Sequence, residues 1–121
     1  MGENNPEVQI EFAPIYEGRV QKLAKKYRHI ETDLKSLYEA LMRGETPGDR
    51  IPGLVGFIVY KERVNNRDSR KGKRGGYRVI YQVKTADLVV LLFIYSKNDQ
   101  ENIATDDIKR IIEDQKSTNE D

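Results

Sequence analysis

The sequence predicts an α+β domain in which an N-terminal strand and a helical hairpin pack on a mostly antiparallel sheet of four strands, with a short C-terminal helix. Two observations lead to this fold class. Apolar residues recur at helical spacing in the first third of the chain, whereas β-branched and aromatic residues dominate three later segments. With 121 residues, the chain also has the length of one ordinary domain. We therefore expect a single domain over residues 1–121, with residues 1–6 and 116–121 disordered.

The N-terminal part of the chain predicts one strand and two helices. Apolar and polar residues alternate over Val8–Phe12, which is the pattern of a half-buried strand. Pro14 suits the first turn of a helix, and Thr32 or Asp33 suits the start of a second helix that ends at Gly44. The apolar positions expected to face the core are Ile15, Val20, Leu23, Ala24 and Tyr27 in the first helix and Leu34, Leu37, Tyr38 and Leu41 in the second.

The C-terminal part predicts a three-stranded meander followed by a helix. Gly44–Gly53 is rich in glycine and proline and is therefore expected to be a loop. Strands are expected at Leu54–Val64, Tyr77–Lys84 and Leu88–Tyr95, and the last is apolar on both faces, as a central strand should be. A long polar loop, Asn65–Gly76, joins the first two of these strands. The closing helix is expected to begin at Thr105, with an apolar stripe of Ile108, Ile111 and Ile112.

Composition excludes several classes of protein. The chain has no cysteine, which excludes disulfides, thiolate zinc sites and a cysteine nucleophile. His29 is the only histidine, so no histidine cluster can hold a metal, and we expect no cofactor. Residues 1–6 are polar and lack the apolar core of a signal peptide, and no apolar run approaches the roughly 18 residues of a membrane span. We therefore expect a soluble, cytoplasmic protein.

Charge is balanced overall but unevenly distributed. The net charge is +1, yet residues 61–78 contain eight basic and two acidic side chains, a local charge of +6. Residues 99–121 reverse this, with eight acidic and three basic side chains and a local charge of −5. This distribution predicts a site for a polyanion in the basic segment, with the acidic C-terminal helix lying near it.

Three segments carry a resemblance to a known family. Residues 71–81 have the sequence KGKRGGYRVIY, preceded by VYKER at residues 59–63 and followed by IYSKN at residues 94–98. Together these segments resemble the RelE/ParE superfamily of toxins from type II toxin–antitoxin systems, and most closely its RelE/HigB-like branch. The resemblance implies the RelE-like fold and a metal-independent endoribonuclease. Such an enzyme binds mRNA and the 70S ribosome, cleaves mRNA in the A site, and is held inactive by a cognate antitoxin.

The resemblance also implies a set of site residues. Arg78 matches the family's arginine and would stabilise the scissile phosphate, because a guanidinium offers a planar, permanently charged fork to phosphate oxygens. Lys61 and Arg63 match two further basic positions, and Lys61 could be the general base only if neighbouring cations lower its pKa. Lys97 matches the basic residue after the last strand, and Tyr95 is the best placed aromatic substitute. The residues expected to contact the RNA backbone are Arg67, Arg70, Lys71, Lys73 and Arg74.

This sequence departs from the family pattern near its C-terminus, and alternatives remain open. RelE itself has an arginine and a tyrosine where this chain has Asn98 and Ile103, and the histidine that some HigB-like members place there is absent. A ParE-like inhibitor that binds DNA gyrase without cutting RNA is one alternative. The other is a degenerate, non-toxic protein that still binds its antitoxin. The basic loop could also be a solvated hairpin.

Overall fold

The computed structural model describes residues 7–69 and 75–119, with side chains up to Gln115. The described part contains three helices and a mixed sheet with the strand order β1-β5-β4-β3-β2. The elements, in chain order, are β1 (Gln9–Phe12), α1 (Pro14–Ala24), α2 (Ile30–Met42), β2 (Asp49–Arg50), β3 (Val59–Val64), β4 (Tyr77–Thr85), β5 (Leu88–Ser96) and α3 (Thr105–Asn119). The predicted α+β class is confirmed, and the sheet has five strands instead of four.

The fifth strand is β2, which lies inside the segment predicted to be a loop. Asp49 pairs with Lys61 and Arg50 with Tyr60, antiparallel to β3. Gly48 allows this approach, because its φ of 101° is in the region that favours glycine and an added Cβ would meet the backbone carbonyl of Lys61. A two-residue strand has no periodic pattern of its own, so only pairing with a distant segment reveals it.

The other pairings place β5 inside the sheet, between β1 and β4. β1 runs parallel to β5, whereas β4 runs antiparallel to both β5 and β3. The fully buried positions of β4 and β5 explain why these two strands are predicted so clearly from their apolar composition. β3 begins at Val59 and not at Leu54, because Gly53 and Gly56 adopt positive φ values and leave Val55 90% exposed before the strand starts.

One face of the sheet is covered by the helical hairpin. Tyr27, just after α1, makes an edge-to-face ring contact with Tyr77 of β4, with ring centres 5.8 Å apart. Leu34, Leu37 and Leu41 of α2 are buried in the same core. α2 begins at Ile30, two or three residues before the predicted start, and its N-cap residue makes no capping hydrogen bond through its side chain.

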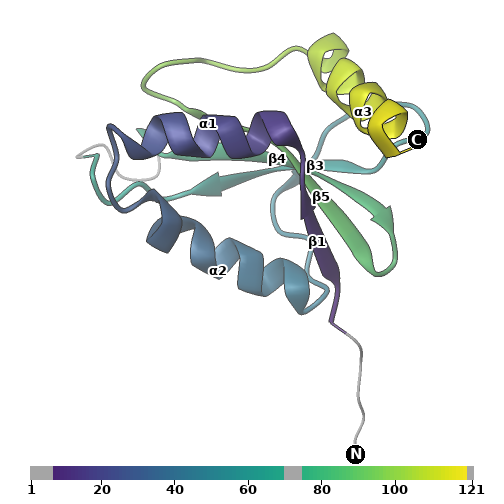
Figure 1. Ribbon diagram of the computed structural model, residues 1–121, viewed down its shortest axis with the longest axis horizontal. Helices are drawn as coiled ribbons and strands as arrows, with labels where there is room; N and C mark the ends of the chain where they lie inside the picture. Colours follow the sequence, from purple (N-terminus) through teal and green to yellow (C-terminus); the bar gives the residue numbers. More distant parts are fainter. Residues whose placement is uncertain (1–6, 70–74, 120–121) are drawn as a thin grey trace, which may run out of the picture.

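α3 lies on the opposite side of the sheet from α2 (Figure 1). Its predicted apolar stripe of Ile108, Ile111 and Ile112 is buried, and Ile108 shares a cavity with Lys61 and Ile80. The helix continues to Asn119, so it includes residues 116–119, for which the sequence predicts disorder. No helix in the part of the chain that the structure describes is long and apolar enough to cross a membrane.

Candidate functional site

Three of the predicted site residues form a row across three neighbouring strands. Arg63 of β3 is the Cα partner of Arg78 of β4, which is in turn the partner of Tyr95 of β5. Residues directly opposite each other in paired strands project from the same face of a sheet. By the same pairing, this face also carries Ile80 and Phe93, so it is the face that α3 partly covers. We call these three residues the Arg63–Arg78–Tyr95 row.

Arg78 is the buried member of this row. It is only 7% exposed, and its Nη1 donates to the carbonyl oxygen of Tyr77 at 3.2 Å. Burial lowers the pKa of its guanidinium and the positive charge of Arg63 lowers it further, whereas Tyr95 raises it. Arginine nevertheless stays protonated in proteins. Two like charges opposite each other on paired strands repel, so a bound anion would stabilise this pair.

Lys61 lies two residues before Arg63 and therefore on the same face of β3. Its Cα partner is Ile80, and the side chain is half-buried. Lys61 lines a cavity of about 370 Å³ together with Asp49, Thr105 and Ile108. The acidic first turn of α3 is therefore close to the face of the sheet that carries Lys61, Arg63 and Arg78. This is the arrangement expected from the charge distribution.

Tyr95 and Lys97 are held by the segment between β5 and α3. The hydroxyl of the buried Tyr95 donates to Oδ1 of Asn102 at 3.5 Å, a long contact. Burial raises the pKa of Tyr95, with Arg78 opposing this shift and Glu101 adding to it. The Nζ of Lys97 donates to the carbonyl oxygen of Glu101 at 3.1 Å, and the Lys97 backbone N–H donates to Gly76. Lys97 thus lies beside Gly76, the residue that immediately precedes β4.

Arg19 of α1 supports the same region, although no sequence pattern marks it as a site residue. Its Nε donates to the carbonyl oxygen of Ile94 at 2.6 Å, and its guanidinium carbon lies 4.2 Å from the centre of the Phe93 ring. Its Nη2 also donates to Gln100 at 3.3 Å, and Gln100 donates to the carbonyl oxygen of Asn102 at 2.9 Å. The contacts of Arg19 thus join α1 to β5 close to Tyr95, between residues that are at least 74 positions apart in the sequence.

The described part of the loop after β3 is anchored to the helical hairpin. Nε of Arg67 donates to Oδ1 of Asp33 at 2.9 Å, and Arg67 remains about half exposed, as contact with RNA would require. Asp68 accepts from the backbone N–H of His29 at 2.8 Å, and its other oxygen lies 2.8 Å from His29 Nδ1. The other four residues predicted to contact RNA lie outside the described residues: Arg70, Lys71, Lys73 and Arg74.

The contacts of Asp68 predict a contribution to stability that depends on pH. The backbone N–H and the ring of His29 hold the pKa of the Asp68 carboxyl below its usual range, which is about 4. A depressed pKa in the folded state stabilises the protein above the unfolded pKa, and this stability is lost as the pH falls through the folded value. Between pH 7 and pH 2.5, thermal unfolding should therefore show a smaller acid-induced loss in Asp68→Asn than in the unmodified protein.

A matched variant separates this effect from a general loss of negative charge. Glu39→Gln removes an exposed carboxylate of α2 that makes neither of these contacts, and it should keep the full acid-induced loss. An Asp68→Asn variant with the same acid-induced loss as the unmodified protein would contradict the predicted contribution of Asp68.

Among residues 7–69 and 75–119, no three histidine, cysteine or carboxylate side chains lie together in a way that could hold a metal ion. The row itself offers two guanidinium groups and a phenol, and the nearby Lys61 and Lys97 add ammonium groups. These groups can bind a phosphodiester, stabilise charge on its oxygens and exchange protons with it.

Comparison with known proteins identifies one family. Residues 15–120 match the family described as the RelE toxin of the RelE/RelB toxin–antitoxin system. A search of curated proteins finds no match. The matched region includes α1 except Pro14, then α2, α3 and every strand from β2 to β5, and with them the Arg63–Arg78–Tyr95 row. The chain therefore belongs to the RelE toxin family of toxin–antitoxin systems.

Proposed function

We propose that this toxin is a metal-independent endoribonuclease that cleaves mRNA in the ribosomal A site. The observation that carries the proposal is the Arg63–Arg78–Tyr95 row, which places two guanidinium groups side by side on one face of the sheet. A pair of adjacent, permanently charged groups suits the oxygens of a phosphodiester better than a neutral ligand. Membership of the family also implies a cognate antitoxin as partner.

In the proposed reaction, the 2′-hydroxyl of one nucleotide attacks the adjacent phosphorus. A base accepts the proton of this hydroxyl, and the new bond to phosphorus closes a 2′,3′-cyclic phosphate. The bond from phosphorus to the 5′-oxygen of the next nucleotide breaks, and this oxygen takes a proton from an acid. Arg78 and Arg63 stabilise the negative charge that grows on the phosphoryl oxygens.

The two lysines are the best placed groups for proton transfer. Arginine keeps its proton, and the Tyr95 hydroxyl is buried and directed to Asn102. Because Tyr95 is the cross-strand partner of Arg78, we assign its side chain to the positioning of Arg78 in the free protein. Lys61 is partly exposed on the same face of the sheet, and we assign it the role of the base. Lys97, also partly exposed, is assigned the role of the acid.

The test is cleavage of a defined mRNA by the purified protein, with and without programmed 70S ribosomes, followed by mapping of the 5′ ends of the products. We expect cuts only when ribosomes are present, at a fixed place within the A-site codon. The same preparation should leave the supercoiling activity of DNA gyrase unchanged. Folded protein that cuts no mRNA in either condition would contradict the proposal. Inhibition of gyrase by that protein would instead support the ParE-like alternative.

A further inference from the structure

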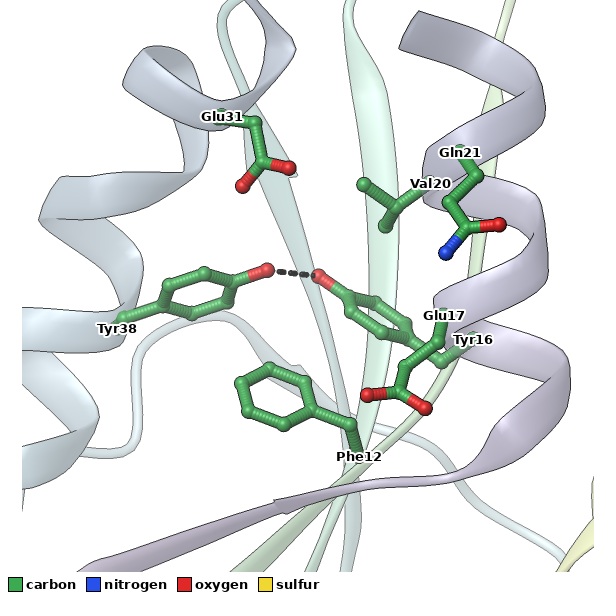
Figure 2. A pocket seen from close by; sticks show the side chains of 7 residues that line it. All are labelled: Phe12, Tyr16, Glu17, Val20, Gln21, Glu31 and Tyr38. Carbon is green, nitrogen blue, oxygen red and sulfur yellow. Dashed lines mark hydrogen bonds between the residues drawn. The ribbon is translucent and has the colours of Figure 1, made fainter.

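A second cavity lies between α1 and α2. Its volume is about 220 Å³. No strand of the Arg63–Arg78–Tyr95 row contributes to its lining, so it is a separate site. Figure 2 shows side chains from β1, α1 and α2 converging on it. Its lining consists of Phe12, Tyr16, Glu17, Val20, Gln21, Glu31 and Tyr38. We call it the α1–α2 cavity.

Three aromatic rings form one wall of this cavity. The hydroxyl oxygens of Tyr16 and Tyr38 are 2.7 Å apart and share a hydrogen bond across the two helices. The Phe12 ring stands edge-on to Tyr38, with ring centres 5.5 Å apart, and its centre is 5.9 Å from that of Tyr16. Phe12 is 37% exposed, although it is a large apolar residue. Phe12 thus offers an accessible aromatic surface, Tyr38 is half-buried, and Tyr16 is buried behind them. The hydroxyl oxygen of Tyr38 can accept a further hydrogen bond.

Two carboxylates flank the aromatic wall. Figure 2 shows Glu31 of α2 on one side of the tyrosine pair and Glu17 of α1 beside Tyr16. Both glutamates are exposed. Burial is the main cause of the raised pKa of Tyr16 and of Tyr38, and the negative charge of Glu31 contributes to both shifts. The negative charge of Glu31 therefore acts on the hydroxyl groups of both Tyr16 and Tyr38.

We propose that the α1–α2 cavity is a docking site for an arginine side chain of the antitoxin. A guanidinium stacks on aromatic rings and donates to carboxylates at the same time, so it matches both features of this cavity. The volume is below the roughly 300 Å³ at which small-molecule pockets begin, so it suits one side chain. The two carboxylates would repel the phosphates of RNA, which excludes the substrate as the occupant.

This proposal rests on the antitoxin partner that family membership implies, and it does not depend on the nuclease reaction. It concerns a surface of α1 and α2, whereas the proposed reaction uses β3, β4 and the segment after β5. Measurements of antitoxin binding therefore test it separately from measurements of RNA cleavage.

The first experiment uses a small probe on the full chain. N-acetyl-arginine amide is titrated against protein with labelled aromatic residues, and the NMR signals of Phe12, Tyr16 and Tyr38 are followed. N-acetyl-citrulline amide has nearly the same shape without the charge and should bind at least about five times more weakly. Equal binding of the two probes, or no shift of these signals, would overturn the proposal.

The second experiment measures the affinity of the purified toxin for its purified antitoxin. A Glu17→Gln/Glu31→Gln variant should lose about tenfold in affinity, because it removes both charged acceptors and keeps the shape of the cavity. A Glu7→Gln/Glu39→Gln variant removes the same charge at exposed positions outside the cavity and should change the affinity less than about twofold. Equal affinities of the two variants for the antitoxin would overturn the proposal, even if the arginine probe binds. The cavity would then bind a free cation without contributing to the binding of the antitoxin.

Discussion

Replacing Arg78 with alanine is expected to lower the rate of ribosome-dependent mRNA cleavage by about 10²- to 10³-fold. The guanidinium is the buried member of the Arg63–Arg78–Tyr95 row, so it is held in place and is little hydrated before the substrate arrives. A charge in such an environment stabilises the developing negative charge of the transition state more than an exposed charge does. The measurement is the single-turnover rate of cleavage on programmed ribosomes.

Two further variants separate loss of chemistry from loss of structure. Arg78→Met removes the charge but fills most of the space of the buried side chain, and we expect it to lose as much activity as Arg78→Ala with a smaller loss of stability. Arg43→Ala removes an exposed arginine that pairs with Glu45 at the end of α2, far in the sequence from the row, and it should cleave normally. A folded Arg78→Met protein with normal cleavage would contradict the role given to Arg78.

An intermediate result is expected from Arg78→Lys. Lysine keeps the positive charge and loses the planar fork that binds two phosphate oxygens at once. We therefore expect this variant to cleave at a rate between those of the unmodified protein and Arg78→Met. Equal rates in Arg78→Lys and Arg78→Met would show that the geometry of the guanidinium matters more than its charge.

The sequence predicts this site in part because its residues lie on strands with strong local patterns. β4 and β5 are recognisable as strands from the sequence, and Lys61 and Arg63 are two residues apart on β3, so they lie on one face. What the sequence cannot supply is the register. Arg63 and Arg78 become neighbours only through pairing across the long loop between β3 and β4, and Tyr95 joins them through the pairing of β4 with β5. An irregularity between Ile80 and Tyr81 changes the pairing partners in the later part of β4.

Contacts between distant segments account for the other differences. Arg19 has the sequence context of an ordinary exposed helix residue, and its role depends on β5 lying beside α1. The buried stripe of α1 is also rotated from the prediction. Tyr16 is buried and the predicted Ile15 is 44% exposed, because a position spaced by four residues from Val20 faces the core more directly than one spaced by five. The α1–α2 cavity follows from this rotation, since Tyr16 meets Tyr38 across the hairpin.

Replacing Gly76 with alanine is the second change for which we expect a large effect, here on stability. Gly76 immediately precedes β4, and an added Cβ would collide with the carbonyl oxygen of Val64 and lie 3.2 Å from its carbonyl carbon. Both atoms belong to the backbone, so no side-chain rotation can relieve the contact. The pair formed by Val64 and Tyr77 must separate, and this pair is adjacent to that of Arg63 and Arg78.

We expect Gly76→Ala to lower the free energy of unfolding by about 1–3 kcal/mol, as measured by urea unfolding. Gly18→Ala is the matched control, because Gly18 lies in α1, is exposed, and has no atom within 4 Å of an added Cβ. That variant should gain about 0.5–1 kcal/mol, since alanine favours the helix more than glycine does. The same chemical change should thus have opposite signs at the two positions. A Gly76→Ala protein as stable as the unmodified one would mean that β3 and β4 can separate at this end without cost, and the close approach of Arg63 and Arg78 would then not depend on Gly76.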